Sequence, residues 1–328
     1  MPHRSAPVRS TSVILASVLS CIVVASVHAQ SPAPAPKDVD PTVMSTVTVE
    51  AAPKPKVIER QAHTFVESYA ASPNAELDQV ARWRDPVCVQ VEGLPADSGG
   101  LVKARIEDVA KAVGLPKARA GCTANVEIVF TDKPQALMDN VAKRRETLLG
   151  YYHRHDRDKL KTVTRPIQAW YVTATRGGGG SRAAALYGVD LPADIEVVDD
   201  PDNQGPVGCG INPHFSACVQ SNIKNVFVVA DTKALDGKDL GLLADYLVMV
   251  TLSQPRSLNG CNALSSVLDV LASPACTGRD EPDGVTPGDA AYLTALYSTD
   301  IEAKKASQLA DIAVRMAKIL TKASAGGR

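Results

Sequence analysis

The fold is decided by residues Asn225 to Gln254, which read NVFVVADTKALDGKDLGLLADYLVMVTLSQ. The β-branched and aromatic run Val226 to Val229 is typical of a buried strand. After a polar turn, ten of the fourteen residues from Leu240 to Ser253 are apolar, and they occupy every side of a helical wheel. A helix that is apolar all round is buried on all faces. We therefore expect this helix to lie at the centre of the fold.

Other stretches supply further strands and helices. Three earlier stretches are predicted strands: residues 87–91, 125–131 and 167–174. Helices are predicted at 57–71, 100–113, 134–149, 263–272, after the Thr286-Pro287 start and at 302–321. The last of these is expected to bury Leu309, Ile312, Met316 and Ile319. A few strands followed by helices predict an α+β fold, with a small mixed β-sheet, a buried central helix and a helical C-terminal part.

Residues 1–29 are predicted to be a signal peptide. Arg4 and Arg9 form a positive region, Val13 to Val27 an apolar core, and Val27-His28-Ala29 a small-residue cleavage site. The apolar core is shorter than the roughly 20 residues that a membrane-spanning helix needs. The mature chain is therefore expected to be periplasmic or secreted and not to span a membrane.

The next 27 residues, 30–56, are rich in proline and alanine and cannot bury a core. We expect them to form a disordered leader. Residues 57–328 are then a single α+β domain with its core at about 83–321.

The charge of the chain argues against a nucleic-acid partner. Without the two signal-peptide arginines, 33 of the 35 basic residues remain against 36 acidic ones, a net charge of −3. Aromatic residues are only 4% of the chain, which leaves no stacking platform for bases. The partner is otherwise unknown; an exported chain would meet other proteins of the cell envelope.

Six of the seven cysteines follow the signal peptide, and an even number in an exported chain predicts disulfides. Six cysteines allow 15 pairings, so the connectivity is open. Proximity along the chain favours Cys88–Cys122, Cys209–Cys218 and Cys261–Cys276. A metal site is the alternative, but the chain has no C-x-x-C pair.

The segments VCVQVEG, ANVEIVFTD, NVFVVAD followed by DYLVMVTLSQ, and TPGDAAYLTALYSTD carry a resemblance. The chain resembles a family of uncharacterised exported bacterial proteins with a zincin-metallopeptidase-like scaffold. The resemblance spans roughly Asp85 to Lys318 and implies a His-Glu-x-x-His motif on the helix after the last strand. Asp245 and Tyr246 stand at the first two motif positions here, and Met249 stands at the second metal ligand. The motif is lacking, so the resemblance implies no catalytic zinc at this helix.

Asp245 and Tyr246 are nevertheless candidate polar residues of a cleft. A carboxylate on an apolar helix needs hydrogen bonds or a charged partner. In one interpretation Asp245 accepts hydrogen bonds from a neighbouring loop and fixes that loop. In the other it is a polar group on the floor of a residual cleft.

Three histidines are weak candidates for a metal site elsewhere: His153, His155 and His214. The sequence contains neither a phosphate-binding glycine motif nor a G-x-S-x-G elbow. No catalytic residue, cofactor or metal ligand is therefore assigned. Our hypothesis is a non-catalytic exported binding or structural protein of the cell envelope. The alternative is a divergent zinc-dependent peptidase or hydrolase with an unrecognised metal site.

Overall fold

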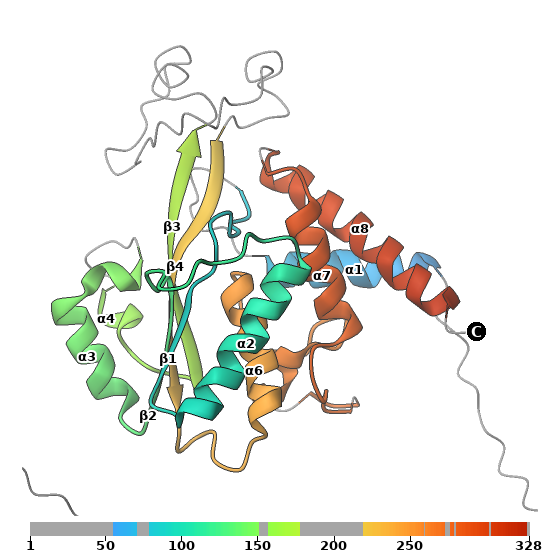
Figure 1. Ribbon diagram of the computed structural model, residues 1–328. Helices are drawn as coiled ribbons and strands as arrows, with labels where there is room; N and C mark the ends of the chain where they lie inside the picture. Colours follow the sequence, from blue (N-terminus) through green and yellow to red (C-terminus); the bar gives the residue numbers. More distant parts are fainter. Residues whose placement is uncertain are drawn as a thin grey trace, which may run out of the picture. The chain divides into compact units, whose positions relative to one another are not determined.

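A four-stranded mixed sheet is the framework of this computed structural model (Figure 1). The structure describes residues 55–70, 79–150, 157–177, 219–258, 260–272, 276–278, 280–301 and 303–326. The predicted signal peptide and nearly all of the predicted leader lie outside these ranges. The described residues all belong to one compact unit, and its sheet and helices confirm the predicted α+β class.

The strands lie in the order β1, β2, β4, β3 across the sheet. Strand β1 (Val89–Glu92) pairs in parallel with β2 (Val126–Thr131), and β2 pairs in parallel with β4 (Val219–Asp231). Strand β3 (Ile167–Gly177) pairs antiparallel with β4 and forms the other edge. The two long strands β3 and β4 extend together beyond the rest of the sheet in Figure 1.

Helices cover both faces of the sheet. Helices α2 (Ala96–Ala112) and α6 (Leu240–Leu252) pack on one face, and α3 (Pro134–Arg144) packs on the other with the 3-10 turn η1 (Glu146–Leu149). Strand β4 is buried on both faces, which explains its unbroken apolar run. Its side chains alternate between the two cores, with Val226, Val228 and Ala230 in one and Phe227 and Val229 in the other.

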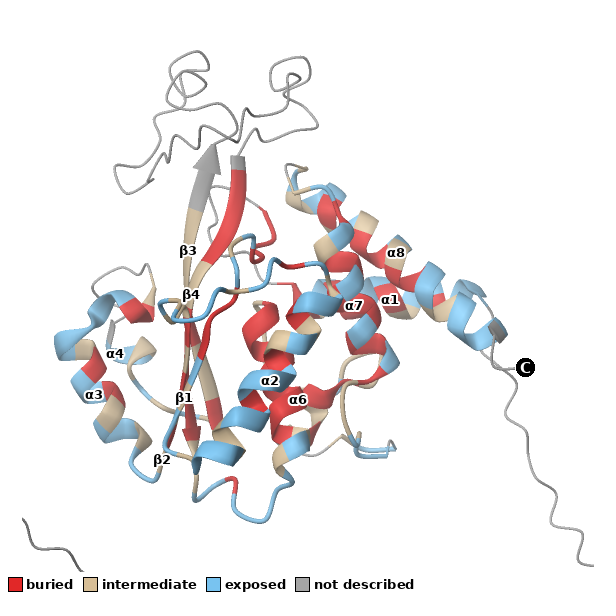
Figure 2. Cartoon of the chain, viewed as in Figure 1, coloured by how far each residue is buried: buried red, intermediate tan, exposed pale blue. Residues whose placement is uncertain are grey.

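Helix α6 is buried throughout, as expected. All ten residues from Leu243 to Leu252 are buried, and α6 is mostly red, the colour of buried residues, in Figure 2. The side of α6 away from the sheet is covered by α1, η3 and α7, while α8 packs on α1 and α7. These elements are α1 (Pro55–Tyr69), η3 (Val267–Leu271), α7 (Pro287–Ser298) and α8 (Lys305–Gly326); the short α4 (Arg157–Leu160) precedes β3.

The core begins earlier than the expected limit near residue 83. Helix α1 contributes Phe65 and Tyr69, both 0% exposed, and their rings stack with centroids 4.4 Å apart. Both rings also meet Tyr292 of α7 edge-on. The first helix is therefore part of the main core.

The long helix expected at 134–149 is broken at Arg145. Helix α3 ends at Arg144, and η1 follows directly. Both terminal nitrogens of Arg145 bond the Glu127 carboxylate at 2.7 Å, which holds this corner against β2. The break lets Leu148 and Leu149 turn into the second core with Trp170.

The buried face of α8 differs from the expected one. Ile312 and Met316 are buried, but Leu309 is only partly buried and Ile319 is 37% exposed. The face instead continues through Ala313 and Ala317. The buried face of α8 is therefore made of small as well as large apolar side chains.

Two of the three expected disulfides are confirmed. Cys88–Cys122 joins the residue before β1 to the segment before β2, and Cys261–Cys276 closes a loop that contains η3. The expected pair Cys209–Cys218 lies outside the described residues. Within the described ranges, no helix has the length and hydropathy needed to cross a membrane.

Candidate functional site

Asp245 on α6 is 8% exposed, and its carboxylate accepts hydrogen bonds from two donors. Arg105 of α2 donates from Nε to Oδ1, and the backbone nitrogen of Val285 donates to Oδ2 over 3.1 Å. A Cβ on Gly284 would lie 2.7 Å from Oδ2, so the loop passes very close to the carboxylate. Asp245 thus fixes the loop before α7, as the first interpretation expected.

An open recess of about 430 Å³ also borders Asp245. It is strongly acidic, because three further carboxylates surround it and Arg105 is its one cation. Asp239 among them accepts a hydrogen bond from Leu242 at 2.9 Å and caps α6. Across the described part of the chain, no cluster of His, Cys, Asp and Glu could hold a metal ion. The recess is lined by Leu101, Ala104, Arg105, Asp108, Asp239, Gly241, Leu242, Ala244, Asp245 and Asp283.

Tyr246 does not line this recess. Neighbouring helical residues project about 100° apart, and Tyr246 leaves α6 on another side. It is 1% exposed, and burial raises the pKa of its hydroxyl well above the ordinary value. The structure therefore does not bring the two candidate cleft residues into one site.

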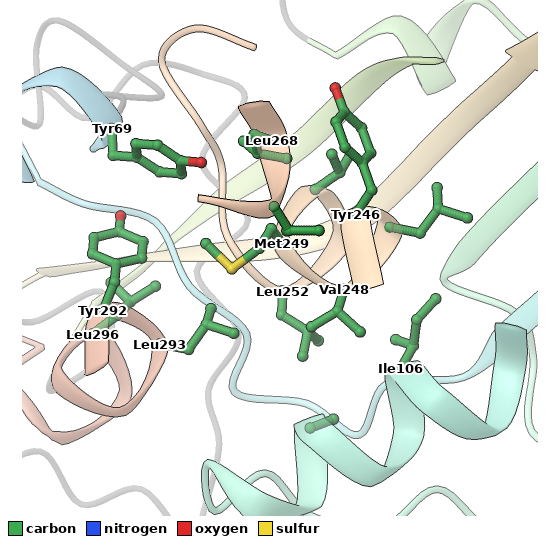
Figure 3. Packing of buried hydrophobic residues seen from close by; sticks show 14 of the residues in the cluster. Tyr69, Ile106, Tyr246, Val248, Met249, Leu252, Leu268, Tyr292, Leu293 and Leu296 are labelled. Carbon is green, nitrogen blue, oxygen red and sulfur yellow. The ribbon is translucent and has the colours of Figure 1, made fainter. Parts of the chain in front are cut away.

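Met249, at the position of the second metal ligand in the resembled motif, is 0% exposed. Figure 3 shows its side chain among Tyr69, Leu268, Tyr292 and Leu293. These apolar surfaces come from α1, η3 and α7. The position is part of the core.

A buried polar network lies close to the same helices, and sequence reasoning missed it. Ser266 Oγ donates to Asp289 Oδ1 over 2.7 Å and lies 2.5 Å from the Tyr69 hydroxyl. A serine has one proton to donate, so Tyr69 is the donor to Ser266. Asp289 Oδ2 accepts from the backbone nitrogens of Val267 at 2.8 Å and Thr286 at 3.1 Å.

The network connects α1, η3 and α7. Asp289 is 0% exposed, and burial raises the pKa of its carboxyl while the hydrogen bonds act in the opposite sense. Thr286 and Ser266 each begin their helix with a capping box. The Ser266 box was readable in the sequence as Ser-x-x-Asp, but its bond to Asp289 was not. With every named donor paired inside the core, the network is structural.

Arg82 is a second buried ionisable group that sequence reasoning missed. It is 3% exposed and donates to the backbone oxygens of Leu296 and, at 2.8 Å, Thr299. These carbonyls belong to the C-terminal end of α7, where a cation is favourable. Burial lowers the pKa of Arg82 to about 10. Its role is to hold α7 in place.

A hollow of about 930 Å³ lies between α1 and α8. We call it the α1–α8 groove. Small and apolar residues of α8 form its floor and basic residues stand at its sides. It is lined by Pro55, Lys56, Glu59, Arg60, His63, Ala313, Val314, Ala317, Lys318, Thr321, Lys322 and Ala325.

The candidate metal histidines His153, His155 and His214 lie outside the described residues. His63, the one histidine among the described residues, lines the α1–α8 groove. No family model matches the chain, and neither a curated protein nor a solved structure matches it.

Proposed function

We propose that the mature chain is a non-catalytic binding or structural protein of the cell envelope, built on a zincin-like scaffold. The observation that carries this proposal is the environment of two side chains of α6, Asp245 and Met249. Both oxygens of Asp245 already accept hydrogen bonds, and Met249 is enclosed by apolar side chains. Met249 thus presents no donor atom to a metal, and Asp245 is held by Arg105 and Val285.

The remaining motif position also argues for a non-catalytic role. A catalytic zinc needs three protein ligands, an open coordination position and a nearby general base. Tyr246 stands where the resembled motif has its glutamate, and burial raises its pKa. A buried phenol that keeps its proton does not serve as a base near neutral pH.

The disulfides support an exported location. Cys88–Cys122 and Cys261–Cys276 are bonds that persist in oxidising compartments such as the periplasm or the exterior. The first joins the residue before β1 to the segment before β2, and the second closes the loop that contains η3. A protein held in this way suits a binding or structural role outside the cytoplasm.

A peptidase assay tests the proposal. The mature chain, with added zinc, is incubated with a quenched-fluorescent peptide library, with and without a chelator. We expect cleavage at the level of the buffer control in both samples. Chelator-sensitive cleavage that follows the protein through purification would contradict the proposal and favour a divergent zinc hydrolase.

A further inference from the structure

The α1–α8 groove combines a small-residue floor with an exposed apolar side chain. Ala313 and Ala317 are nearly or fully buried, and Val314 between them is 45% exposed. Small residues allow another helix to approach closely. Val57 of α1 and Ile319 of α8 are also exposed, at 41% and 37%, but neither of them lines the groove.

The sides of the groove are basic. Lys56 and Arg60 come from α1, Lys318 and Lys322 come from α8, and Glu59 is the one acidic lining residue. All four cations are exposed, and within the described ranges none of them forms an ion pair with a carboxylate. The mature chain as a whole is slightly acidic, so this concentration of positive charge is local.

The shape and charge of the groove select one kind of occupant. A second copy of the same groove would bring like charges together, which is repulsive. A bilayer surface is flat on this scale, whereas the groove is concave and lies between two helices. Helix α1 has 15 residues, which corresponds to a length of roughly 22 Å, about four helical turns.

We propose that the α1–α8 groove binds an acidic amphipathic helix of a partner protein. Its small apolar residues would lie on Val314, the exposed apolar side chain of the groove, and beside the exposed Ala325. Aspartate or glutamate residues on either side would pair with the four cations of the groove. This is helix-in-groove recognition with charge complementarity at the sides. The inference rests on the proposed binding function and names the partner class.

The test uses the complete mature chain and a fluorescent synthetic helix with an Ala/Leu stripe flanked by glutamates. We expect saturable binding by anisotropy that weakens as salt is raised. The double variant Lys318→Glu/Lys322→Glu should weaken binding by about tenfold or more. The matched control Lys133→Glu/Lys143→Glu, with the same charge change on and beside α3, should bind like the parent. A peptide with lysine in place of glutamate should not bind.

Three results would overturn the inference: no binding of the acidic peptide, equal binding by the groove variant, or binding to phosphatidylglycerol vesicles alone that the groove variant loses. The last result would assign the groove to a membrane surface. Failure here is distinguishable from failure of the proposed function. If the protein shows no peptidase activity and does not bind the acidic peptide, only this inference is overturned. Chelator-sensitive cleavage overturns the proposed function, whether or not the peptide binds.

Discussion

The Oδ2 atom of Asp245 lies 3.1 Å from the backbone nitrogen of Val285, which donates a hydrogen bond to it. The same carboxylate accepts from Arg105 through its other oxygen. One side chain of the central helix thus joins α6 to α2 and to the loop before α7. Asp245 therefore has a structural role.

Replacing Asp245 by alanine should destabilise the fold. The change leaves the partly buried Val285 amide without its acceptor, so we expect a loss of about 1–3 kcal/mol in the free energy of unfolding. Urea denaturation measures it. The control is Asp283→Ala, an exposed carboxylate of the same recess, which should change stability by less than about 0.5 kcal/mol. Equal stability of the two variants would contradict the structural role of Asp245.

Two glycine substitutions should act in opposite directions. A Cβ on Gly284 meets Asp245 Oδ2 at 2.7 Å, so Gly284→Ala must move the loop or the carboxylate and should destabilise the fold. Gly100 lies inside α2, and a Cβ there meets nothing within 4 Å. Gly100→Ala should therefore stabilise by about 0.5–1 kcal/mol. Thermal unfolding of both variants checks the signs, and a stabilising Gly284→Ala would show that the loop does not approach α6 as described.

Removing the Ser266 hydroxyl should make stability more dependent on pH. Burial raises the pKa of Asp289, so the folded state keeps a proton that the unfolded state releases above the ordinary value of 3.8. Stability therefore falls as pH rises from 3.8 through the raised pKa. Ser266→Ala removes a donor to the carboxylate and raises this pKa further. We expect its destabilisation, about 1–3 kcal/mol at neutral pH, to be smaller near pH 4.

Tyr69→Phe is the control for this pH effect. It removes the bond from the phenol to Ser266 but keeps the bond from Ser266 to Asp289. Its destabilisation should therefore be nearly the same at both pH values. If Ser266→Ala shows no more pH dependence than Tyr69→Phe, the hydrogen bond to Asp289 does not act on its carboxyl group as described.

Thiol titration tests the cysteine pairing of the whole mature chain. With Cys88–Cys122 and Cys261–Cys276 formed and Cys209–Cys218 predicted, denatured and unreduced protein should contain essentially no free thiol. Two or more free thiols would contradict the pairing and weaken the case for export, because disulfides persist mainly outside the cytoplasm.

The central helix and the sheet could be predicted because their signals are local. The segment after Leu240 is apolar on every side, which favours a buried helix. Thr286 followed by proline marked the start of α7. The stripe of α1, which includes Phe65 and Tyr69, was equally regular. Its membership of the core was missed because the proline-rich leader beside it suggested that the fold starts later.

The features that sequence reasoning missed depend on distant partners. Asp289 is buried because Ser266 and Val267, more than twenty residues earlier, supply its donors. Ile319 was expected inside because large apolar residues define a face, but the small residues Ala313 and Ala317 are buried in its place. The α1–α8 groove exists only once residues from opposite ends of the chain meet.

The zinc content of the mature, tag-free protein distinguishes the proposed non-catalytic role from that of a zinc-dependent hydrolase. Protein purified without chelators and analysed by plasma mass spectrometry should contain zinc far below one ion per chain. A stoichiometric zinc ion that disappears in His153→Ala, His155→Ala or His214→Ala variants would contradict the account.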